Sequence, residues 1–195
     1  MDFPKPDRDV MPSWAEWMTG WPGTSLAFFW GFAEGTLFFI LPDVPLSFVA
    51  LFRPRRAVTH MAAILAGAVL AGAVMFSWSA HSEDAIHAVA RVPAVSPRMF
   101  EQADRDWSRY GVWGLSLGPV RGIPYKVYAV EAPRRSRLTV FLMATVPARL
   151  WRFVLVWLCF AGTGALLRRL DRLSLAPALH ALFWIVTYII YWTTV

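Results

Sequence analysis

Long apolar stretches separated by short polar segments run through most of this chain. A helix needs about 20 mainly apolar residues to cross a bilayer, because each residue adds only ~1.5 Å. Three stretches reach that length, at residues 57–80, 138–167 and 173–195. The pattern therefore predicts an all-α, multi-pass membrane protein built as a helical bundle.

Two further apolar stretches are interrupted. Residues 24–41 are long enough for about one span, but a Pro-Asp-Val-Pro turn at 42–45 ends them, and the apolar return at 46–52 is too short to cross. Residues 113–130 contain several glycines and prolines, which break a straight helix. Non-helical backbone at membrane depth is tolerated only inside protein or beside a cavity. We therefore expect two broken, re-entrant helices.

The two interrupted stretches open two segments of similar layout. Residues 24–80 and residues 113–167 each run from a broken helix through a basic loop into a long apolar helix. If each broken helix returns to its own side of the membrane, the second segment is inverted relative to the first. Such inverted repeats recur in transporters, with the binding site where the broken helices meet.

The other segments frame this core of residues 23–172. Residues 1–22 form a polar lead-in, residues 81–112 an interfacial loop between the repeats, and residues 173–195 a final transmembrane helix. Both a solvated loop and a short amphipathic helix fit residues 97–110. The helix would carry on one face Met99, Phe100, Ala103 and Trp107.

Composition agrees with a membrane protein. The chain is 57% hydrophobic and 16% charged, whereas soluble domains have about 25% charged residues. The net charge of +6 comes mostly from arginines that flank the apolar stretches, where they attract anionic lipid headgroups. No basic face outside the spans carries interleaved aromatic residues, so nucleic-acid binding is not expected.

Four ionisable residues lie in or beside the broken segments. Glu34 and Asp43 belong to the first, and Arg121 and Lys126 to the second. A charge at the bilayer centre costs about 2.5–3.5 kcal/mol even on lenient scales, so such residues indicate a polar site at membrane depth.

Two arginines of the long stretch 138–167 are secondary candidates for this site. Arg149 and Arg152 are three residues apart and share one helical face. Their side chains either point into the bundle or extend toward the membrane surface, and the sequence leaves both readings open.

Most of the chain, about residues 25–168, resembles the DedA family, also called the VTT or SNARE-associated membrane domain. The resemblance is carried by Phe-Ala-Glu at 32–34, Leu-Pro-Asp at 41–43, small residues at 62–74, Tyr-Gly at 110–111, GPVRGIP at 118–124 and the helix around Trp151. The chain departs from the family pattern where Val127 occupies the position of a second arginine and where the glycine of the Pro-Gly-acid turn is missing.

The resemblance implies a transporter-like protein of the bacterial inner (plasma) membrane. Members are linked to flipping the lipid carrier undecaprenyl phosphate, to homeostasis of the proton-motive force and, in eukaryotic relatives, to phospholipid scrambling. On this resemblance Glu34 and Asp43 match the two family acids, and Arg121 with Pro124 matches the first half of the basic signature.

The chemistry of a lipid phosphate suits these residues. We expect Arg121 to hold two phosphate oxygens through its planar guanidinium, Lys126 to add a point charge, and the backbone around Gly122 and Pro124 to donate further hydrogen bonds. Membrane lipids, with a phosphorylated lipid as substrate, are then the partners.

Carboxylates taken out of water can carry protons near neutral pH, so Glu34 and Asp43 are candidates for proton coupling. The alternative is that Glu34 pairs with Arg121 only to neutralise both charges and hold the bundle together.

Two other function classes stay open. One is a membrane assembly or structural factor, in which the re-entrant loops bind a partner. The other is an intramembrane enzyme, which is disfavoured because no hydrolase or metal-binding motif is visible. We expect no catalytic residue, cofactor or metal. Basic loops are balanced between the two sides, which allows dual orientation or an antiparallel homodimer.

Overall fold

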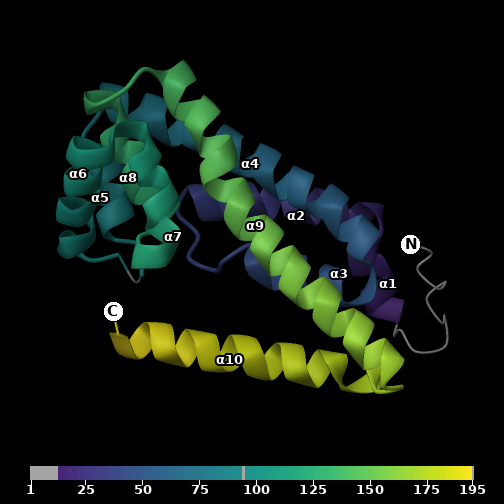
Figure 1. Ribbon diagram of the computed structural model, residues 1–195. Helices are drawn as coiled ribbons and strands as arrows, with labels where there is room; N and C mark the ends of the chain where they lie inside the picture. The colour runs from purple at the N-terminus through teal and green to yellow at the C-terminus, as the bar shows by residue number, and fades with distance from the viewer. Residues whose placement is uncertain (1–12, 94, 195) are drawn as a thin grey trace.

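The computed structural model describes residues 13–93 and 95–194, and within these ranges the chain is helical and has no strand (Figure 1). The expected all-α architecture is confirmed. The helices in chain order are α1 (Ser13–Thr19), α2 (Trp21–Gly35), α3 (Asp43–Phe52), α4 (Pro54–His81), α5 (Asp84–Ala90), α6 (Pro97–Tyr110), η2 (Gly111–Leu117), α7 (Gly118–Arg121), α8 (Tyr125–Glu131), η3 (Ala132–Arg134), α9 (Leu138–Arg169), η4 (Leu173–Leu175) and α10 (Ala176–Thr194).

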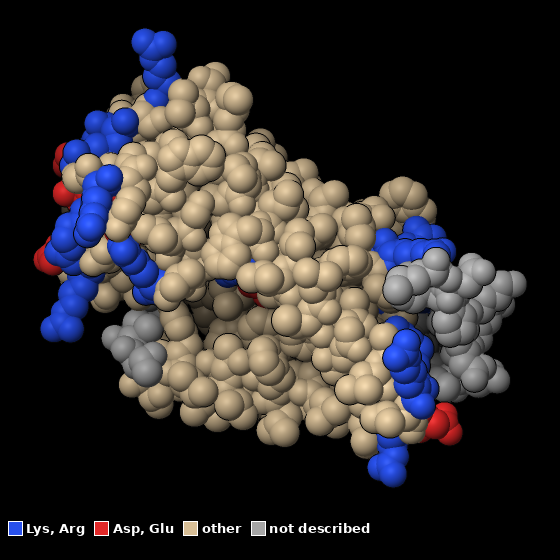
Figure 2. All heavy atoms as spheres, in the orientation of Figure 1, with Lys and Arg blue, Asp and Glu red and all other residues tan. Residues whose placement is uncertain are grey.

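Three helices are long and apolar enough to cross a membrane. Within the described ranges they cover Pro54–His81, Leu138–Arg169 and Leu173–Thr193, so the three long apolar helices are confirmed to within a few residues, and that they cross a membrane stays a prediction. On the face shown in Figure 2, lysine and arginine side chains gather at the two ends, and the surface between them is nearly free of charged atoms. Helices α4, α9 and α10 expose many large apolar side chains, so we call this surface the apolar belt. Length, composition and this charge distribution together indicate a membrane protein.

The first interrupted stretch breaks where the sequence predicts it. Helix α2 ends at Gly35, and both the backbone N–H and the hydroxyl of Thr36 donate to the last carbonyls of that helix, those of Phe32 and Ala33. Residues 36–42 are irregular, and α3 begins at Asp43 after Pro42. The result is a pair of helices joined by a loop in the middle of the molecule (Figure 1).

The second interrupted stretch forms a tighter hairpin. Helix α7 ends at Arg121. Gly122, the residue after it, takes a left-handed φ of +69°, and the Ile123 N–H donates to the Gly118 carbonyl over 2.9 Å. Pro124 is extended and precedes α8, a position at which its missing N–H removes no helical hydrogen bond. We call residues 118–131 the hairpin.

The two halves of the chain pack reciprocally. Helix α2 lies against α4 of its own half while α3 lies against α9 of the other half; likewise η2 lies against α9 while α8 lies against α4. Glycines allow the closest approaches: a Cβ at Gly31 would run into the backbone of Ile64, and one at Gly164 into that of Leu51.

The segment between the halves is more ordered than a solvated loop. Residues Pro97–Tyr110 form α6, with Ala103 and Trp107 buried and Met99 and Phe100 half-buried, so the amphipathic helix and its apolar face are confirmed. In the lead-in, residues 1–12 lie outside the described ranges, and α1 packs on α2.

Candidate functional site

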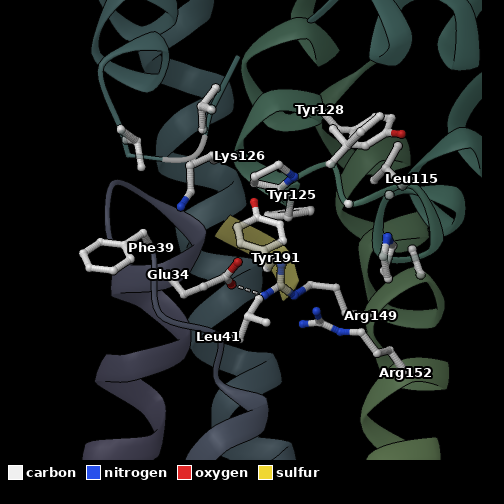
Figure 3. A pocket seen from close by; sticks show the side chains of 18 of the residues that line it. Glu34, Phe39, Leu41, Leu115, Tyr125, Lys126, Tyr128, Arg149, Arg152 and Tyr191 are labelled. Atoms are coloured by element: carbon white, nitrogen blue, oxygen red, sulfur yellow. Dashed lines mark hydrogen bonds and ion pairs between the residues drawn. The ribbon is translucent and has the colours of Figure 1, made fainter. Parts of the chain in front are cut away.

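One cavity lies where the two broken segments meet the long helices. It holds about 180 Å³, well above the ~10–15 Å³ that one water needs, and its walls come from the end of α2, the hairpin, α9 and α10. Four charged side chains line it and point toward the same space in Figure 3: Glu34, Lys126, Arg149 and Arg152.

Glu34 and Arg149 form a buried ion pair at this cavity. Both residues are only 4% exposed, and an Nη2 hydrogen of Arg149 is donated to Oε2 of Glu34 (Figure 3). The guanidinium carbon of Arg149 also lies 4.6 Å from the centre of the Tyr125 ring, a cation–π distance. The aromatic face and the carboxylate together fix the direction of this arginine.

Arg152, one turn further along α9, pairs with the second acid. Its Nη2 lies 3.2 Å from Oδ2 of Asp43, which is 2% exposed and sits in the first turn of α3, where a helix favours negative charge. Arg149 and Arg152 therefore point into the bundle, and the alternative that they extend to the membrane surface is wrong.

Lys126 brings a third cation from the hairpin. It is 1% exposed, and its ammonium donates over 2.6 Å to the carbonyl oxygen of Phe38, in the loop after α2. No carboxylate of the described residues forms an ion pair with it. The partial negative charge of this carbonyl oxygen therefore stabilises the Lys126 ammonium only in part.

The charges of this cluster do not cancel. Three cations, Lys126, Arg149 and Arg152, face two carboxylates, Glu34 and Asp43, so the formal balance is 3 − 2 = +1 when all are ionised. Polar atoms are also left without a partner, namely Oδ1 of Asp43 and Nε of each arginine. Excess positive charge and unpaired N–H donors in a buried site favour the binding of an anion.

Arg121 lies in a different cluster. It pairs with Asp106 of α6, which is 1% exposed and also accepts from the Tyr128 hydroxyl over 2.7 Å and from Gln102 over 3.0 Å. Arg121 is not among the cavity-lining residues, whereas Gly122 and Pro124 are. The alternative in which Glu34 pairs with Arg121 is wrong, because Arg149 occupies that position.

The last helix is part of the site, which the sequence did not indicate. Thr187, Tyr188 and Tyr191 of α10 line the cavity, and the Tyr188 hydroxyl accepts from the N–H of Leu41 over 3.0 Å. Leu41 lies in the loop between the two acids, so α10 contacts the segment that sets their positions.

In comparisons with known proteins, no family model, curated protein or solved structure matches this chain. The resemblance to the DedA family therefore stays a prediction that rests on the residues quoted above.

Proposed function

We propose that this protein is a membrane transporter that moves a phosphorylated lipid, of the undecaprenyl phosphate kind, across the bilayer. One observation carries the proposal: three cations face two buried carboxylates at one cavity, which Lys126, Arg149, Arg152 and Glu34 line while Asp43 lies behind Arg152. A phosphate supplies the missing negative charge, and its oxygens accept several hydrogen bonds at once.

Arg149 and Arg152 are the main phosphate-binding groups of this proposal. They lie one turn apart on α9, both line the cavity, and each retains an unpartnered Nε hydrogen. A guanidinium binds phosphate through two parallel hydrogen bonds, and Lys126 adds a point charge from the opposite wall. Arg121 has no direct role here because Asp106 occupies it.

In the absence of lipid, the carboxylates of the two acids occupy the arginines in place of the substrate phosphate. Glu34 and Asp43 hold Arg149 and Arg152 while the cavity is empty of lipid, which avoids the cost of unpaired buried cations. An arriving phosphate competes with them, and a proton taken up by the displaced carboxylate keeps the charge of the site low. Binding of the headgroup is thereby coupled to proton movement.

The architecture supports the same proposal. The reciprocal packing of α3 on α9 and of α8 on α4 fits two inverted repeats whose broken helices enter the membrane from opposite sides. The DedA resemblance adds the expectation of a bacterial inner-membrane protein.

Lipid flipping in proteoliposomes tests the proposal. The substrate is a fluorescent polyprenyl monophosphate, and flipping is compared for the wild type, Arg152→Gln and Arg152→Lys. The matched control is Arg169→Gln, an exposed arginine near the end of the same helix. We expect the control to flip the lipid at the wild-type rate and Arg152→Gln to be inactive. Arg152→Lys should flip the lipid more slowly than the wild type, because lysine keeps the positive charge but lacks the paired N–H donors of a guanidinium. Wild-type protein that is folded yet does not flip this lipid, with or without a pH gradient, contradicts the proposal.

A further inference from the structure

The cavity reaches the outer surface of the molecule in its apolar belt. Figure 2 shows a hollow between the main body and α10, with blue and red atoms of buried charged residues visible beside it. Beyond the charged groups, Thr187 and the tyrosines, the cavity wall is apolar and includes Val92, Val95, Leu115 and Ile123. An opening of this composition is suited to contact with hydrocarbon.

The first half of α10 is fastened to the bundle. Nε2 of His180 lies 2.9 Å from the Ser47 hydroxyl of α3, and the Trp184 indole N–H donates to the same hydroxyl over 3.0 Å. Phe160 of α9 contacts the Phe183 ring with a centroid distance of 5.2 Å. These contacts fix the helix at the end opposite to the opening.

The second half of α10 forms one side of the opening. Tyr188 and Tyr191 line the cavity, while Ile189 and Ile190 are 58% and 57% exposed on the outer face. Its contacts with the body include the Tyr188 hydrogen bond to Leu41 and a Phe39–Trp192 ring contact at 6.3 Å. The contacts with Ser47 and the opening therefore lie in different halves of α10.

We propose that the space between the second half of α10 and the hairpin is a binding groove for a single hydrocarbon chain. The inference rests on the proposed function: the phosphate sits at Arg149 and Arg152, and the chain of the same lipid leaves sideways into the bilayer past Tyr191 and Ile123. Tyr188 connects the groove to the two acids, because its hydroxyl accepts a hydrogen bond from Leu41, which lies between Glu34 and Asp43 in the chain. A chain entering the groove therefore shifts the loop that joins the two helices carrying the internal carboxylates.

Reversible closure of the groove tests this inference. In a Cys159→Ser background, which removes the single cysteine, Ile123→Cys and Tyr191→Cys place one thiol on each side of the groove, to be joined by a bifunctional, reducible reagent. The matched control joins Phe160→Cys to Phe183→Cys, across the fastened half of α10. The probe is a polyprenyl monophosphate with a diazirine in its chain, in phosphatidylglycerol and phosphatidylethanolamine vesicles, and labelled residues are located by mass spectrometry.

We expect labelling at the groove residues that excess unlabelled polyprenyl monophosphate suppresses. Cross-linking residue 123 to residue 191 should abolish this labelling, and adding reductant to the same sample should restore the labelling. Cross-linking residue 160 to residue 183 should leave the labelling unchanged. Two results would contradict the groove but not the proposed function. In the first, saturable labelling is lost in Arg152→Gln but falls on residues outside the groove. In the second, such labelling persists after residues 123 and 191 are joined. Absence of any saturable labelling overturns the proposed function, and the groove with it.

Discussion

Replacing Glu34 by glutamine changes the charge of the buried site with little change of shape. The variant leaves Arg149 without its carboxylate and raises the formal balance of the cluster from +1 to +2. Removing one partner of a buried ion pair costs about 3–5 kcal/mol, because the other charge stays buried and unpaired. At roughly 2–4 °C per kcal/mol for a chain of this size, Tm should fall by about 6–20 °C.

Tm is measured in detergent micelles by the fluorescence of the 11 tryptophans. The double variant Glu34→Gln/Arg149→Met returns the balance to +1, so it should recover most of the lost stability instead of adding a second loss. Added polyprenyl monophosphate should stabilise Glu34→Gln more than the wild type, since it fills the position of the missing carboxylate. A Tm of Glu34→Gln equal to that of the wild type, or losses that simply add in the double variant, would refute the reasoning.

Three further predictions concern the helix contacts, the hairpin and the third cation. Gly164→Ala should cost about 1–3 kcal/mol, because its Cβ would overlap the backbone of α3, whereas Gly162→Ala, which meets nothing within 4 Å, should melt like the wild type. Asp106→Asn should cost about 1–3 kcal/mol and make the hairpin more accessible to hydrogen exchange, because Arg121 loses its carboxylate; unchanged exchange would contradict this. Lys126→Met should weaken phosphate-lipid binding about tenfold or more, measured by titration, and an unchanged Kd would remove this residue from the site.

Much of the fold could be predicted from the sequence, because the period and length of apolar stretches depend on local residues alone. The three long apolar helices, both interruptions and the apolar face of α6 all appear where the pattern indicates them. Prolines at 42 and 124 fix two of the breaks through backbone chemistry, which requires no tertiary information.

Partners across the bundle could not be predicted in the same way. Glu34 lies 115 residues from Arg149, and nothing local distinguishes Arg149 from Arg121 as its partner. Asp106 carried a signal that was missed, since it adjoins Trp107 on the buried side of an amphipathic helix. The role of α10 depends on how the last helix folds back over the cavity, which its mainly apolar sequence does not encode locally.

Direct binding of the lipid at the charged cavity tests the central claim most directly. The Kd of a short-chain polyprenyl monophosphate is measured by titration for the wild type, for Arg149→Gln/Arg152→Gln and for the exposed control Arg169→Gln. The account predicts saturable binding that the double variant loses and the control keeps. Equal affinity in all three proteins, with each shown to be folded, would contradict it.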